Sequence, residues 1–166
     1  MFSEKDEVMI SVILDVLRRV ARITKTRPLT NTEFKGYSRV IGNTIFEMKP
    51  RYSGFTSEAA LLAKFNDKEF LWCNDHMIPR QVAGETLVNG VISLSRVDES
   101  RLREDLWKFT AVNRVTSAEN MKLMVIQKKD GFVSVEKLYN EAGIKLREFA
   151  MRTRISNLPE IYPDLF

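Results

Sequence analysis

Cysteine and long apolar runs are scarce in this 166-residue sequence. The single cysteine, Cys73, excludes an internal disulfide and a cysteine-based zinc set, so we expect a reducing, intracellular compartment. No apolar run reaches the roughly eighteen residues that a membrane-spanning helix needs. The segment 1–7 is charged and unlike a secretory signal. Together these features predict a cytoplasmic protein with no membrane partner.

The composition is that of a folded protein with a modest positive charge. Apolar residues make up 44% of the chain and include ten Phe, four Tyr and two Trp, which can supply a core. The formal charge of +4 is compatible with a polyanionic partner such as nucleic acid. Many proteins without such a partner are equally basic, so charge leaves both possibilities open.

Hydrophobic periodicity predicts a mostly helical chain with few strands. Apolar residues from Val8 to Val20, among them Val12, recur at helical spacing, so we expect an amphipathic helix from Asp6 to about Lys25. Its basic flank would be a solvated face or a phosphate contact. Further helices are expected at about 32–40, 58–65, 81–95, 98–109, 117–128, 134–143 and 145–154, and strands at 44–48, 69–73 and 111–116. In the helix at 81–95 we expect Val82, Leu87, Val91 and Leu94 to point inward, and we expect 158–166 to be irregular.

The only histidine, His76, directly follows an aspartate, Asp75. Histidine has an unperturbed pKa near neutrality, so a histidine beside a carboxylate is a candidate general base. Neighbouring residues on a strand point to opposite faces, so one of the pair would reach a metal ion and the other would address water. A lone Asp-His pair is also common as a structural hydrogen-bonding pair, and that alternative stays open.

Two stretches resemble the HNH nucleases, the ββα-metal group. Asp75-His76-Met77-Ile78-Pro79 is similar to the Asp-His-Ile-(Ile/Val)-Pro signature, and the segment 113–120 resembles the one that follows it in the HNH domain of CRISPR effector nucleases. The resemblance implies that Asp75 and Asn120 bind Mg²⁺ or Mn²⁺ and that His76 is the general base. It also implies that Asn113 braces the loop that holds the histidine.

The resemblance is local and departs from the family in one respect. Thirty-three residues separate Pro79 from Asn113, and two of the expected helices fall among them. Either the ββα motif carries a helical insertion or the two halves match by chance. Asn113 and Asn120 also have a simpler explanation, since asparagine is common at strand ends and helix starts.

Basic and aromatic residues surround the two stretches. The basic residues that would contact nucleic acid are Arg80, Arg114, Lys122, Lys128 and Lys129, which could equally form a solvated face. Trp72 and Trp107 could stack on bases, but we expect both to pack in the core.

The sequence therefore predicts an α+β, mostly helical protein with a small two-stranded ββα-metal-like element, a helical insertion and flanking helices. We expect one domain over 1–166, with an N-terminal helical part at 1–66, the HNH-like motif at 67–130 and a C-terminal helical part at 131–166. The expected function is metal-dependent cleavage of DNA, with RNA not excluded and specificity weak or supplied by a protein partner. Such a nuclease would suit a phage or mobile element. The alternative is a catalytically inactive regulator or inhibitor that binds nucleic acid or a host protein.

Overall fold

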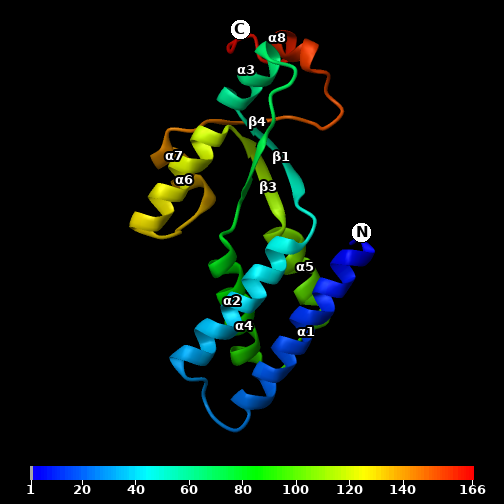
Figure 1. Ribbon diagram of the computed structural model, residues 1–166, viewed down its shortest axis with the longest axis vertical. Coiled ribbons are helices and arrows are strands. Elements are labelled where there is room, and N and C mark those ends of the chain that lie inside the picture. Colours follow the sequence, from blue (N-terminus) through cyan, green and yellow to red (C-terminus); the bar gives the residue numbers. More distant parts are fainter. Residues whose placement is uncertain (1) are drawn as a thin grey trace. The chain divides into compact units, whose positions relative to one another are not determined.

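The computed structural model describes residues 2–166, and Figure 1 shows their helices and strands. In chain order the elements are α1 (Glu4–Thr24), α2 (Asn31–Glu47), β1 (Arg51–Ser57), α3 (Glu58–Asn66), β2 (Cys73–His76), α4 (Arg80–Leu94), α5 (Glu99–Phe109), β3 (Ala111–Val115), α6 (Ser117–Asp130), α7 (Val135–Ala142), β4 (Leu146–Glu148), a 3₁₀ turn (Ile155–Asn157) and α8 (Leu158–Ile161). The prediction of a mostly helical α+β fold is confirmed. None of the helices within residues 2–166 is both long and apolar enough to cross a bilayer.

The chain forms two compact units, each built from two separate segments. The helical unit comprises residues 2–51 and 78–111, and the sheet unit comprises 52–77 and 112–166. The three consecutive parts expected from the sequence do not coincide with these units. Each unit is therefore discontinuous in the sequence, because the segment 78–111 belongs to the helical unit but lies between the two segments of the sheet unit.

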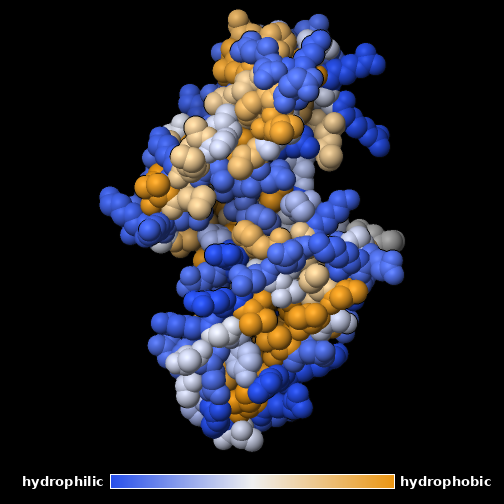
Figure 2. Space-filling view, viewed as in Figure 1, coloured by the Kyte–Doolittle hydropathy of each residue, from blue (hydrophilic) through white to orange (hydrophobic). Residues whose placement is uncertain are grey.

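The helical unit has one core, formed by α1, α2, α4 and α5. In α1 the buried side chains include Ile10, Leu14 and Leu17, whereas Val8 and Val12 are 58% and 42% exposed. The sequence therefore predicts the α1 helix and most of its apolar face, since Ile13, Leu17 and Val20 are buried as expected and only Val8 and Val12 are exposed. Figure 2 shows apolar residues gathered over α1 and α2 on the visible face, between hydrophilic ones.

Residues 44–47 are helical and Met48 is the C-cap of α2, so the strand predicted at 44–48 is wrong. In α2, Ile41 and Ile45 lie four residues apart and are both fully buried. That spacing keeps the two side chains on one side of a helix. In α4 the predicted inward position of Leu94 is also wrong, since its side chain is 43% exposed while Ala83 is buried.

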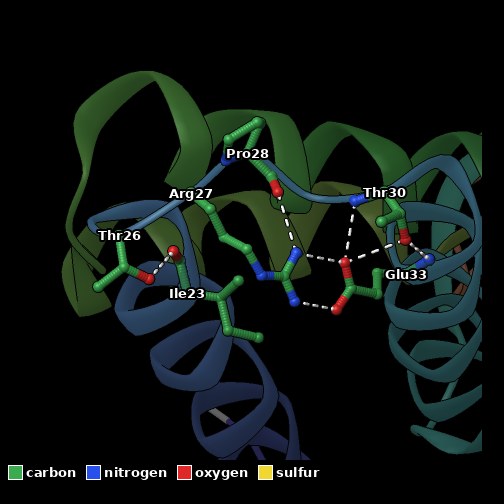
Figure 3. A network of polar contacts seen from close by, with 6 residues as sticks. All are labelled: Ile23, Thr26, Arg27, Pro28, Thr30 and Glu33. Carbon is green, nitrogen blue, oxygen red and sulfur yellow. Dashed lines mark hydrogen bonds and ion pairs between the residues drawn. The ribbon is translucent and has the colours of Figure 1, made fainter.

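The connection between α1 and α2 is held by the ion pair of Arg27 and Glu33, shown in Figure 3. The guanidinium donates to both carboxylate oxygens, at 2.9 and 2.6 Å, and the same carboxylate accepts from the backbone N–H and hydroxyl of Thr30, the N-cap of α2. The hydrogen bond from Arg27, followed by the one from the Thr30 backbone, lowers the pKa of Glu33 to about 2.

The sheet unit contains a sheet with the strand order β2-β3-β1-β4, larger than the two-stranded element predicted. β2 pairs antiparallel with β3, and β1 pairs antiparallel with β4. α6 and α7 contribute Leu123, Leu138 and Tyr139 to a core that also includes Val115 of β3. Trp72 packs at the margin of a second small core that contains Phe149, as predicted.

Three further predictions fail, and a fourth holds only in part. The strand expected at 69–73 lies instead at Cys73–His76, and the helix expected at 145–154 is replaced by β4, whose Arg147 pairs in register with Thr56 of β1. Trp107 is 49% exposed, with the Arg51 guanidinium over its ring, so it is not a core residue. The tail is only partly irregular, because α8 falls within it.

Candidate active site

The Asp75-His76 pair ends β2, the outer strand that pairs with β3. In the register of the two strands, Asp75 lies opposite Asn113 and His76 lies opposite Val112. β3 then leads into α6, which carries Asn120 in its first turn and packs against β2. The chain order is therefore strand, antiparallel strand, helix, with α4 and α5 between the two strands.

The Asp75 carboxylate is buried beneath α7. The residue is 7% exposed, and its Oδ2 accepts a hydrogen bond of 2.5 Å from the Tyr139 hydroxyl. Burial raises the pKa of Asp75, and the Tyr139 hydrogen bond offsets part of that effect. Burial also raises the pKa of Tyr139, and the charge of Asp75 raises it further. At neutral pH this arrangement keeps Tyr139 protonated as a donor to Asp75.

Asn113 ties this site to the neighbouring strand β1. It is fully buried, and its Oδ1 accepts a hydrogen bond of 2.6 Å from Ser53 Oγ. Its Nδ2 is buried and has no hydrogen-bond partner among the described residues, and Asn113 lies opposite Asp75 in the register of β2 and β3. Asp75, Asn113 and Tyr139 thus form one buried polar cluster, whereas a brace from Asn113 to the loop holding His76 stays a prediction.

His76 lies on the other face of β2. Cys73, two residues before Asp75, packs with Asp75 on the face covered by α6 and α7, and burial is the largest cause that raises the pKa of its thiol. Because side chains alternate along a strand, His76 points away from that core. It is half-buried. The two members of the pair therefore address different surroundings, as expected from the sequence.

Asn120 is half-buried on α6, and its backbone N–H donates to the Thr116 carbonyl at 3.0 Å. The start of α6 is fixed by a capping box of Thr116 and Glu119. Glu119 Oε2 also accepts a hydrogen bond of 2.6 Å from Ser57 Oγ, which is itself the N-cap of α3. The helix that carries Asn120 is therefore anchored to the rest of the sheet unit.

The surroundings of Asp75 suit a divalent cation in one respect, because no lysine or arginine forms an ion pair with it within residues 2–166. The same residues contain no group of three or more His, Cys, Asp and Glu side chains that could hold a metal ion. A buried carboxylate without a positive partner is costly, and a cation would remove that cost. One carboxylate and one amide oxygen suit Mg²⁺, which keeps several waters.

The predicted nucleic-acid-binding residues differ in the contacts that their side chains make. The Arg114 guanidinium lies over the rings of Tyr52 and Trp72, 4.2 and 5.3 Å from the centroids. Lys122 Nζ donates to the Ala142 carbonyl at the end of α7. Lys128 and Lys129 are exposed in the last turn of α6. Arg80 belongs to the helical unit.

A pocket of about 750 Å³ opens beside the buried cluster. Its lining includes Asn113 and Tyr139, together with Met77, Glu58 and Arg147. A pocket of this size is in the range that holds small ligands. Asp75, His76 and Asn120 are not among its lining residues.

Sequence reasoning missed Tyr139, Ser53 and the hydrogen bond from Ser57 to Glu119. Tyr139 lies on a helix that the sequence predicts correctly, but no local pattern indicates that its hydroxyl meets a carboxylate 64 positions away. Ser53 lies in β1, a strand that the sequence does not reveal. The one available signal was the buried aspartate itself, since a buried carboxylate requires a donor.

Comparison with known proteins gives no match: no protein-family model fits the chain, and no curated protein and no solved structure is significantly similar to it.

Proposed function

We propose that this protein is a metal-dependent, HNH-like endonuclease that hydrolyses phosphodiester bonds in DNA. His76 is its general base, and Asp75 with Asn120 binds Mg²⁺ or Mn²⁺. The observation that carries the proposal is the pairing of the two motif stretches. Asp75 and His76 end a strand whose antiparallel partner presents Asn113 opposite Asp75 and runs directly into the helix with Asn120.

In this proposal His76 accepts a proton from the attacking water. The water oxygen bonds to phosphorus, and the bond from phosphorus to the leaving oxygen breaks. A bound divalent cation would neutralise charge on the phosphate. Tyr139 orients the Asp75 carboxylate through Oδ2, which leaves Oδ1 as the ligand. Lys128 and Lys129 are exposed, and we assign them to the DNA backbone.

Plasmid nicking with Mg²⁺, with Mn²⁺ and with EDTA tests the proposal. We expect nicking that EDTA abolishes and that Asp75→Asn and His76→Ala each reduce by at least about 100-fold, since general bases contribute about 10²–10⁴. Glu69→Gln, an exposed change in the sheet unit, is the control and should nick at the wild-type rate. Nicking that persists in EDTA or in both variants would contradict the assignment.

One observation favours a second candidate, a regulator or inhibitor that binds DNA or a host protein without cleaving. The Tyr139 hydroxyl already occupies Asp75 Oδ2, and the aspartate is 7% exposed. A site that has lost its metal would tolerate such closure. A salt-sensitive gel shift without cleavage would support a DNA-binding regulator, whereas absence of both would direct attention to a protein partner.

A further inference from the structure

The helical unit contains a pocket of its own, at the crossing of α2 and α4. It measures about 570 Å³. α2 lines it with Lys35, Ser38 and Arg39, and the first turns of α4 line it with Arg80 and Glu85. The helices approach closely at Gly42 and Gly84. A Cβ on Gly42, for example, would lie 2.2 Å from the Arg80 carbonyl oxygen.

Ser38 gives this pocket an unsatisfied hydrogen-bonding group. The residue is 2% exposed, and its hydroxyl oxygen is buried with no hydrogen-bond partner within residues 2–166. Buried hydroxyls are normally paired, because an unpaired one loses its bonds to water without replacement. Ser38 lines the pocket, so a ligand that enters it could supply the partner that this hydroxyl lacks.

The charges around the hydroxyl favour an anion. Among the described residues, Lys35, Arg39 and Arg80 form no ion pair. All three side chains are exposed, so their charges at the pocket carry little desolvation cost. Glu85 is the one opposing charge in the lining, and its Oε1 already accepts a hydrogen bond of 2.9 Å from Gln81 Nε2.

The backbone at the start of α4 adds donors to the same pocket. Its N-cap is Pro79, which makes no side-chain capping bond, and its first turn carries no acidic residue. The N–H groups of the first turn of a helix lack intrahelical acceptors and attract anions, phosphate above all. Here they begin at Arg80 and Gln81, both of which line the pocket.

We propose that this pocket binds a phosphate group, either free in solution or within a nucleic-acid backbone. The Ser38 hydroxyl donates to one phosphate oxygen. The guanidiniums of Arg39 and Arg80 supply charge-assisted hydrogen bonds, and Lys35 adds positive charge. The site lies in the helical unit and does not depend on the proposed cleavage site in the sheet unit. It also gives Arg80 a role separate from the proposed cleavage site.

Titration of the full chain with sodium phosphate, followed by amide chemical shifts at constant ionic strength, tests the site. We expect saturable shifts at Ser38, Arg80 and Gln81, with sodium sulfate as a competitor and sodium chloride without effect. Ser38→Ala should weaken phosphate binding about tenfold or more, because a hydrogen bond to a charged group is lost. Its melting temperature should not fall, since the hydroxyl pairs with nothing in the protein.

Charge variants provide matched comparisons. Arg39→Gln and Arg80→Gln should each weaken binding, and Glu85→Gln should strengthen it by removing the opposing charge. Arg101→Gln, an exposed change on α5 that lies outside the pocket, is the control and should leave binding unchanged.

A second titration, with a short DNA duplex, distinguishes the two sources of phosphate. If the duplex displaces phosphate from the wild-type protein, and if Ser38→Ala weakens duplex binding, the pocket holds a backbone phosphate. If phosphate binds and the duplex does not compete, the pocket holds a free phosphate or phosphate monoester. Binding of neither probe, or binding that Ser38→Ala and Arg39→Gln leave unchanged, overturns the proposal.

Discussion

At the residue scale, the central feature is a carboxylate kept buried by one hydroxyl. Asp75 has Tyr139 as its donor and no lysine or arginine as an ion-pair partner in the described residues, and burial raises its pKa. Stability alone would favour an apolar residue at this position. Retention of a costly charge at a strand end beside a pocket is typical of a functional site.

Tyr139→Phe isolates the contribution of that donor. We expect the variant to lose about 1–3 kcal/mol of unfolding free energy without metal, because a buried carboxylate loses its hydrogen bond. Added Mg²⁺ should recover part of the loss. Urea unfolding with and without Mg²⁺ measures both effects.

Tyr37→Phe, a half-buried tyrosine of the helical unit, is the matched control and should change stability little. Equal losses in the two variants would show that the Tyr139 hydroxyl contributes nothing specific to Asp75.

Glu33 provides a pH-dependent prediction at the same scale. Its pKa falls from 4.5 to about 2 in the folded protein, so the folded state binds fewer protons than the unfolded state between these values. The stabilisation by Arg27 and Thr30 is therefore complete above pH 4.5 and is lost as the pH falls toward 2. Glu33→Gln should remove this dependence.

Urea unfolding between pH 2 and pH 7 measures the effect, as the difference between wild type and Glu33→Gln. That difference should shrink at acid pH. Glu104→Gln should not reproduce it, because Glu104 is exposed on α5 and forms no ion pair within residues 2–166. A difference that does not vary with pH would contradict the account.

At the scale of elements, the sequence predicts what local chemistry determines. Ser57, Asp98 and Ser134 are N-caps, as expected, and Gly143 ends α7 in the left-handed conformation. The strands β1 and β4 escaped prediction because their pairing joins residues about ninety positions apart, as in Thr56 with Arg147. No local pattern reports such a partner, and tertiary pairing overrides propensity.

The crossing of α2 and α4 provides a prediction at this scale. A Cβ on Gly84 would lie 2.0 Å from the Ser38 carbonyl oxygen, which belongs to the backbone and cannot move aside easily. Gly84→Ala should therefore cost about 1–3 kcal/mol of unfolding free energy.

Gly90→Ala on the same helix is the control, since nothing lies within 4 Å of the added Cβ. It should stabilise by about 0.5–1 kcal/mol, the usual gain from replacing a helical glycine. Thermal and urea unfolding measure both variants, and a stable Gly84→Ala protein would contradict the close packing.

At the scale of the whole molecule, the site is assembled by a chain that leaves the sheet unit and returns to it. The predicted residues Asp75 and Asn113 lie opposite each other, although α4 and α5 lie between them in the sequence. The sequence pattern places Asn113 on a strand, and the family resemblance implies a strand for Asp75. It could not indicate Tyr139 or Ser53, because α7 and β1 reach the cluster only through the tertiary fold.

The most direct test of the central claim, that His76 is the general base of a nuclease, is chemical rescue. DNA nicking by His76→Gly should be at least about 100-fold slower than by the wild type, and added imidazole should restore part of the rate by taking the proton from water. Imidazole should not rescue Asp75→Asn, which retains its histidine. An active His76→Gly protein, or one that imidazole leaves inactive while the wild type cleaves, would contradict the account.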